Sequence, residues 1–137
     1  ALANSRRASL IVTLKIAFIF AAFAGTLGVL LGAFGAHALR GSIEPRLMET
    51  FQTAVQYQLI HALALLLVSL TMGWLGQSLS FEISAYAFIA GIILFSGSLF
   101  GLVLTEISWL GPVTPLGGLC LTVGWLALLV GGFRQIA

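Results

Sequence analysis

The sequence predicts an all-α integral membrane protein, a four-helix bundle with a short amphipathic segment before the second span. Of the 137 residues, 60% are hydrophobic and only 7% are charged, and the mean hydropathy is +1.13. Soluble domains carry about 25% charged residues, and a soluble chain of this size could not bury so much apolar surface. Four apolar stretches reach the length of about 20 residues that crosses a bilayer. They cover residues 15–38, 55–75, 81–104 and 115–133, and we expect them to form a single membrane domain over 1–137.

The first span follows a polar tail that contains Arg6 and Arg7. This start resembles a signal peptide, but its apolar run is too long for one, so we expect a retained span. Four glycines of this span fall on one helix face because they are three or four residues apart: Gly25, Gly28, Gly32 and Gly35. Such a stripe lets another helix backbone approach closely in lipid, and it therefore predicts a helix contact.

The second span is preceded by turn and helix-start signals. Gly41 is suited to end the first helix, and Pro45 is suited to the first turn of the next. Between Pro45 and Gln58, apolar residues recur every four positions, which predicts an amphipathic segment. This segment either rests in the membrane interface or leads straight into the second span. Trp74 marks the far end of that span as an interface residue.

The third and fourth spans also carry small residues at helical spacing. The glycines that we expect at helix contacts are Gly91, Gly97 and Gly101 in the third span, and Gly124 and Gly131 in the fourth. In the loop between them, Thr114 is predicted as the N-cap of the last helix and Pro115 as its first residue.

Charge sets the predicted topology and excludes one class of partner. Four spans place both termini on one side of the membrane. Four basic residues lie on that side and two on the other, which favours cytoplasmic termini. A net charge of +2 without a basic run is too low for a nucleic-acid surface. Cys120, the single cysteine, cannot form an intrachain disulfide.

Two histidines are the candidates for chemistry. His37 and His61 lie on helices that the first loop joins, and Tyr57 and Gln58 precede His61 by four and three residues, on its helix face. We therefore expect a polar cluster of His37, Tyr57, Gln58 and His61 at the outer end of the bundle. An ionisable group inside a membrane suggests a function, whereas hydrogen bonding between helices is the more frequent role.

The polar residues do not form a recognisable catalytic or metal-binding pattern. Two histidines on separate helices, without a cysteine or carboxylate at ligand spacing, are a weak metal signal. No nucleophile is paired with a base. The sequence therefore predicts no catalytic residues, no metal and no cofactor.

Four motifs occur in order: LGAFGAHAL at 31–39, TAVQYQLIHALALL at 53–66, FSGSLF at 95–100 and GPVTPLGG at 111–118. In these the chain resembles the domain-of-unknown-function family of small four-helix inner-membrane proteins that includes bacterial YgdD and YwdK. The resemblance implies four transmembrane helices in a bacterial inner membrane, and it implies no established activity, substrate or cofactor. The matching residues are His37, Gln56, Tyr57, His61, Ser96, Gly97, Ser98, Thr114, Pro115, Gly117 and Gly118.

Three functions remain open. The first is a non-enzymatic accessory or assembly subunit of a larger membrane complex, because short loops leave little protein outside the lipid. The second is a homo-oligomeric channel or carrier for a small solute or proton, based on His37, Gln58, His61 and Ser98. The third is a haem- or metal-binding membrane protein. The expected partners are the lipid bilayer and another membrane protein or a second copy of the chain.

Overall fold

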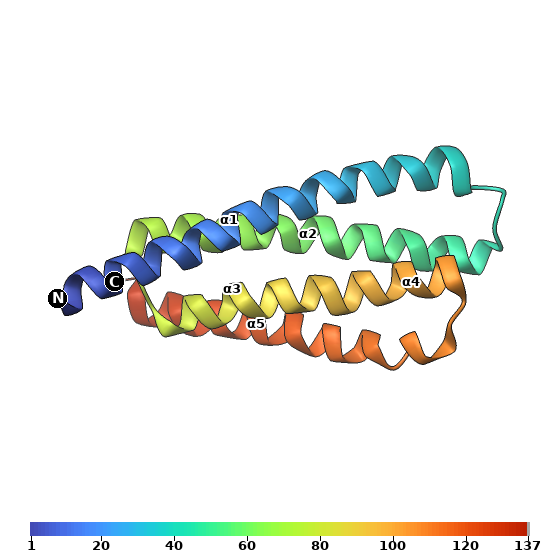
Figure 1. Cartoon of the computed structure of the whole chain (residues 1–137). Coiled ribbons are helices and arrows are strands. Elements are labelled where there is room, and N and C mark those ends of the chain that lie inside the picture. Colours follow the sequence, from blue (N-terminus) through green and yellow to red (C-terminus); the bar gives the residue numbers. More distant parts are fainter. Residues whose placement is uncertain (137) are drawn as a thin grey trace.

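The structure is a computed structural model that describes residues 1–136, and these residues form helices joined by short turns (Figure 1). The elements in chain order are α1 (Leu2–Phe34), the π-helical turn η1 (Gly35–Leu39), α2 (Pro45–Leu75), α3 (Leu79–Gly91), the π-helical turn η2 (Ile92–Ser96), α4 (Gly97–Thr105), the 3-10 turn η3 (Ser108–Leu110) and α5 (Val113–Gln135).

These elements make four rods, each long and apolar enough to cross a membrane: Leu2–Leu39, Pro45–Leu75, Leu79–Thr105 and Ser108–Gln135. The prediction of an all-α protein with four membrane-spanning helices is therefore confirmed. The amphipathic segment forms the first turns of α2 and continues directly into the second span. Pro45 begins α2 as predicted, and Gly41 adopts a φ of 83° in the preceding turn, which suits a residue without a side chain.

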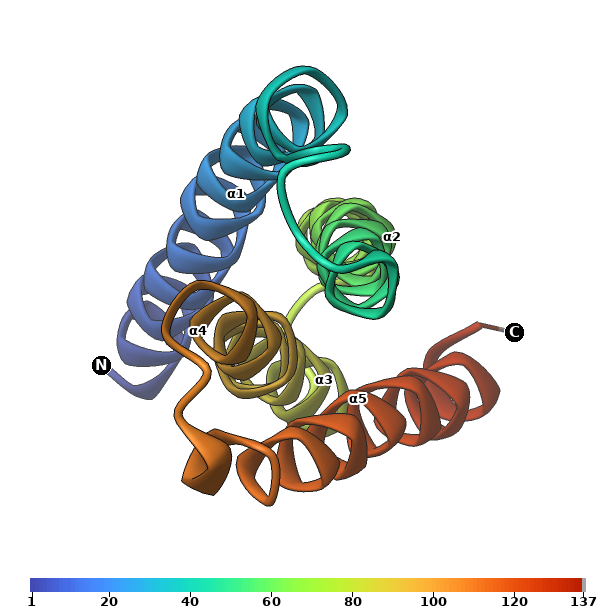
Figure 2. The ribbon, with the colours of Figure 1, turned by 90° about the vertical axis from the view of Figure 1, so that its right-hand side faces the viewer.

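The rods form two antiparallel hairpins. α1 packs on α2, and α5 packs on α3 and η2. Seen along the bundle, the rod of α3, η2 and α4 lies between the other three (Figure 2), and it contacts α1, α2 and α5. In the described part of the chain α1 and α5 do not pack together, and α2 touches α5 only slightly. Both ends of the chain lie at the same end of the bundle (Figure 1).

The main core lies where the two hairpins meet. Small residues of α1, such as Ala17 and Ala21, allow close contact with Leu65 and Val68 of α2. Phe81 and Phe88 of α3 fill the remaining space. A second, smaller core at the loop end is centred on buried Met48, Phe51 and Val103.

Most of the glycines that we singled out adjoin another helix. An added Cβ would come within 3.3 Å of a neighbouring side chain at Gly28, Gly32, Gly35, Gly91, Gly101, Gly124 and Gly131. At Gly25 and Gly97 no atom of a neighbour lies within 4 Å of that position, so the expected contact does not form there.

The closest backbone approach occurs at Gly117, which we did not single out for packing. A Cβ there would lie 2.3 Å from the backbone nitrogen of Phe95 in η2. One turn earlier the Ser98 and Thr114 hydroxyl oxygens are 2.6 Å apart. Thr114 therefore does not cap α5 as predicted. The helix begins at Val113, and the Thr114 hydroxyl instead hydrogen-bonds across to α4.

Candidate functional site: a polar and aromatic groove between α2 and α5

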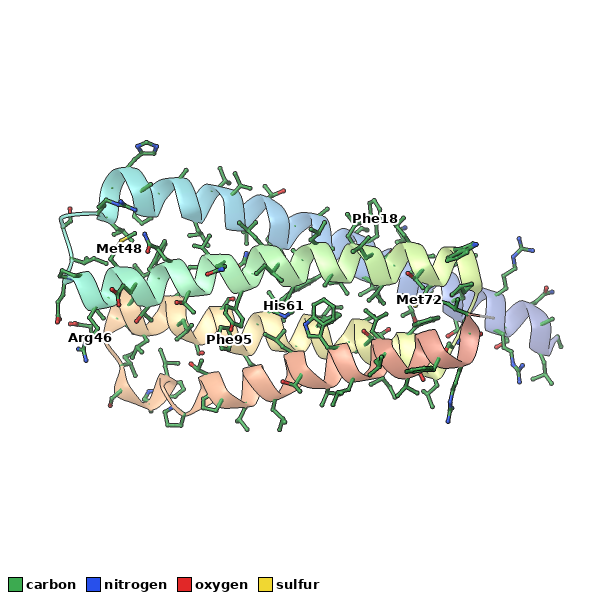
Figure 3. All side chains as sticks on the ribbon, turned by 180° about the vertical axis from the view of Figure 1, so that it is seen from behind. Phe18, Arg46, Met48, His61, Met72 and Phe95 are labelled. Atoms are coloured by element: carbon green, nitrogen blue, oxygen red, sulfur yellow. The ribbon has the colours of Figure 1, made fainter. Side chains whose placement is uncertain are left out.

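His61 projects from α2 toward the third and fourth spans (Figure 3). It is buried and lies 16 residues after Pro45, about 24 Å along the helix at 1.5 Å per residue. The Trp125 indole Nε1 donates to His61 Nε2 over 3.1 Å, and His61 Nδ1 lies 2.7 Å from the Tyr57 carbonyl oxygen. An indole N–H can only donate. Nε2 is therefore the acceptor, Nδ1 carries the proton, and the imidazole is neutral in this arrangement.

Aromatic rings from three spans surround this pair. The Tyr57 ring stacks on Phe95 with centroids 4.5 Å apart and on His61 with centroids 5.7 Å apart. Trp125 meets Phe88 edge-on at 5.2 Å. Offset and edge-to-face pairs of this kind add about 0.5–1.5 kcal/mol each beyond area burial. The rings therefore fix the position of His61 between α2, η2 and α5.

Next to these rings, the slight contact between α2 and α5 leaves an open groove of about 610 Å³. We call it the α2–α5 groove. Its lining residues are Gln56, Tyr57, Ile60, His61, Phe95, Gly118, Leu121, Thr122 and Trp125. A volume of this size is within the range of ligand-binding clefts. Gly118 and Thr122 are small, so they leave space on the α5 side of the groove. The Tyr57 and Trp125 side chains are 40% and 46% exposed.

Two polar groups in this groove have no partner within residues 1–136. The Gln56 side chain is exposed, and neither its amide nor the Tyr57 hydroxyl makes a hydrogen bond there. An unpaired polar group in hydrocarbon costs several kcal/mol. The groove is therefore a surface on which an external hydrogen-bonding partner would be stabilised.

The four residues of the expected polar cluster do not all meet. Tyr57 and His61 contact each other, but the Gln58 amide nitrogen donates to the Ala24 carbonyl oxygen of α1 over 2.8 Å. His37 is exposed in η1 at the loop end, about 20 Å from the level of His61 by helix rise. His61 does not meet His37 because it lies too deep in α2 to reach the end that the first loop joins.

Trp125, Phe95, Gly118 and Thr122 were not identified as site residues from the sequence. A signal for Trp125 was present, since tryptophan normally occurs in membrane proteins at the interface. Trp125 instead lies next to Gly124, the midpoint of α5. A tryptophan at that depth needs a partner for its N–H, and His61 is that partner.

The hydrogen bonds of His61 do not favour metal binding by its imidazole. Both ring nitrogens of His61 are engaged, and across residues 1–136 no three His, Cys, Asp or Glu side chains are grouped so that they could hold a metal ion. Every buried side-chain nitrogen and oxygen of the described residues has a hydrogen-bond partner. The side chains of this site therefore interact with one another through hydrogen bonds and aromatic contacts.

The family model and the similar proteins point to the same family. The model of the protein family of unknown function DUF423 matches residues 31–118. The UPF0382 membrane protein YwdK of Bacillus subtilis is 39% identical over 123 residues, 90% of this chain and all of that protein. UPF0382 membrane proteins of Staphylococcus aureus and Staphylococcus haemolyticus are 39% and 36% identical, over 88% and 90% of this chain and 98% and 99% of theirs.

No solved structure matches this chain. The family model covers the turn between the first two spans, the second and third spans and the motif that begins α5. The relatives share nearly their full length with the chain, and they are named as membrane proteins. The chain therefore belongs to the DUF423 family of membrane proteins, as its motifs predicted.

Proposed function

We propose that the protein is a non-enzymatic accessory or assembly subunit of a larger complex in the bacterial inner membrane, with its termini in the cytoplasm. We further propose that a transmembrane helix of the partner protein packs into the α2–α5 groove. The single observation that carries this proposal is the groove itself, in which Tyr57, Trp125 and an unpartnered Gln56 amide lie beside the small residues Gly118 and Thr122.

The composition of the groove suits a helix better than lipid chains alone. Membrane helices associate through close packing over small residues and through hydrogen bonds between helices. Gly118 supports such packing, because an added Cβ there would meet only the Phe95 ring, at 3.8 Å. Acyl chains can fill an apolar groove, but they offer no group that pairs with the Gln56 amide.

The alternatives have less support from the contacts. A channel or carrier needs polar side chains that are free to face a path, whereas Gln58 donates to the α1 backbone and Ser98 pairs with Thr114. A haem or metal site at His61 would have to displace Trp125 or the Tyr57 carbonyl from the ring nitrogens.

A matched pair of variants tests the proposal. Gly118→Leu fills the groove, and Gly97→Leu places the same side chain on an exposed site outside it. Each variant is expressed at its natural level, extracted in a mild detergent, and its complex is weighed by native mass spectrometry. We expect a stoichiometric foreign membrane protein with the wild type and Gly97→Leu, and its loss with Gly118→Leu. A wild-type complex that contains only copies of this chain would favour the homo-oligomeric carrier instead.

A further inference from the structure

A second groove lies between α1 and α2, at the end of the bundle where the first loop joins the helices. There the α1 and α2 ribbons diverge (Figure 1), and Met48 projects into the space between them (Figure 3). The groove has a volume of about 360 Å³. We call it the α1–α2 groove, and its lining residues are Gly32, Gly35, Ala36, Arg40, Met48, Phe51, Gln52, Val55, Gln56 and Leu59.

The polar residues of this groove lie at graded depths along the helices. Arg40 lies at the mouth, just after η1. Gln52 and Gln56 follow on α2 and are one turn apart, about 6 Å along the helix. Both glutamines are exposed, and neither forms a hydrogen bond within residues 1–136. The groove therefore offers a cation at its mouth and the Gln52 amide below it, whereas the deeper Gln56 also lines the α2–α5 groove.

Arg40 is available for an anion. The ion pair among the described residues joins Arg46 to Glu44 at 3.8 Å, and it leaves the Arg40 guanidinium without an acidic partner. No acidic residue lines the groove. Arginine binds phosphate through two parallel hydrogen bonds, which a lysine cannot provide.

The other residues that line the groove are apolar. Phe51, Val55 and Leu59 of α2 line it, and Gly32 and Gly35 of α1 pack directly against α2. An added Cβ at Gly35 would be 2.7 Å from the Phe51 ring. At Gly32 an added Cβ would already be 3.3 Å from Val55. The two helices are therefore in contact at this level, and an acyl chain would lie along the open side of the groove over this contact.

We propose that the α1–α2 groove binds one glycerophospholipid, with the phosphate on Arg40, an ester carbonyl near Gln52, and one acyl chain along the apolar lining of the groove. The order of groups in such a lipid, with charge outermost, esters a few ångströms deeper and hydrocarbon below, matches the order of groups in the groove. The two grooves share one lining residue, Gln56, and the lipid site does not depend on it. The lipid proposal can therefore be tested independently of the proposed partner.

The test is lipid binding by the full-length chain, delipidated in detergent and titrated with phosphatidylglycerol while bound lipid is counted by native mass spectrometry. We expect one tightly bound lipid per chain. Arg40→Ala should weaken binding about tenfold, as expected when a charge-assisted contact is lost. Gln52→Leu should weaken it less. Arg46→Ala removes an interface charge that does not line the groove and should leave binding unchanged.

Two further ligands separate the lipid from its parts. Diacylglycerol has the chains and esters without the phosphate, and inorganic phosphate has the anion alone. We expect both to bind at least tenfold more weakly than phosphatidylglycerol. Equal binding of either ligand, or equal losses with Arg40→Ala and Arg46→Ala, would overturn the proposal. Circular dichroism of each variant verifies that the helices are intact, so that a loss of binding is not a loss of folding.

Discussion

Replacement of Gly117 by alanine should destabilise the protein more than any other single-methyl change. The new Cβ would lie 2.3 Å from the Phe95 backbone nitrogen and 2.7 Å from the Leu94 carbonyl carbon. Restoring an ordinary contact of 3.4 Å requires the α5 and η2 backbones to move apart by about 1.1 Å. A backbone cannot rotate away as a side chain can, so we expect a cost near the upper end of the usual overpacking range, about 3 kcal/mol.

The neighbouring glycine is the matched control. At Gly118 the added Cβ would meet only the Phe95 ring, at 3.8 Å. Both substitutions add one methyl group to the same helix, so the gain in helix propensity, about 1 kcal/mol in water, cancels in the comparison. The free energy of unfolding is measured by titrating detergent-solubilised protein with sodium dodecyl sulfate. A difference below about 0.5 kcal/mol between Gly117→Ala and Gly118→Ala would refute the close approach of η2 and α5.

Further predictions follow from the same contacts. Gly28→Leu should lower the free energy of unfolding by about 1–3 kcal/mol, because its Cβ alone would be 2.6 Å from a side chain of α2. Gly25→Leu should leave the free energy of unfolding unchanged, and equal effects of the two variants would argue against the α1–α2 contact. His61→Gln should be tolerated, and His61→Leu should cost more because the indole N–H of its partner loses its acceptor; the same unfolding titration would contradict this if both variants were alike. With cytoplasmic termini, a membrane-impermeant thiol reagent added outside the cell should label a cysteine at Ser42 and not one at Gln135, and the reverse pattern would mean an inverted topology.

Much of the fold could be predicted because each signal was local. The apolar runs were long enough to identify four spans, and Pro45 marked the start of α2 without reference to any other helix. The side of each helix that meets a neighbour was less predictable. Gly25 and Gly28 share one stripe, but only Gly28 reaches α2.

The site was predictable only in part because it depends on distant contacts. His61 and Trp125 are 64 residues apart, and no periodicity within α2 indicates which residue of α5 it meets. The π-helical turn at 92–96 also shifts the register of the third span, which brings the Phe95 backbone against Gly117. Such a turn follows from tertiary packing and has no clear sequence signal here.

The most direct test of the proposed role is photo-crosslinking in living cells from the wall of the α2–α5 groove. Benzoylphenylalanine is placed at Thr122, which lines the groove, or at Val123, which is exposed at the same depth on another face of α5. If a partner helix occupies the groove, Thr122 should crosslink to one foreign membrane protein in high yield, and Val123 should crosslink mainly to lipid. Equal crosslinking from both positions, or no protein crosslink from Thr122, would contradict the assignment of the groove as a partner site.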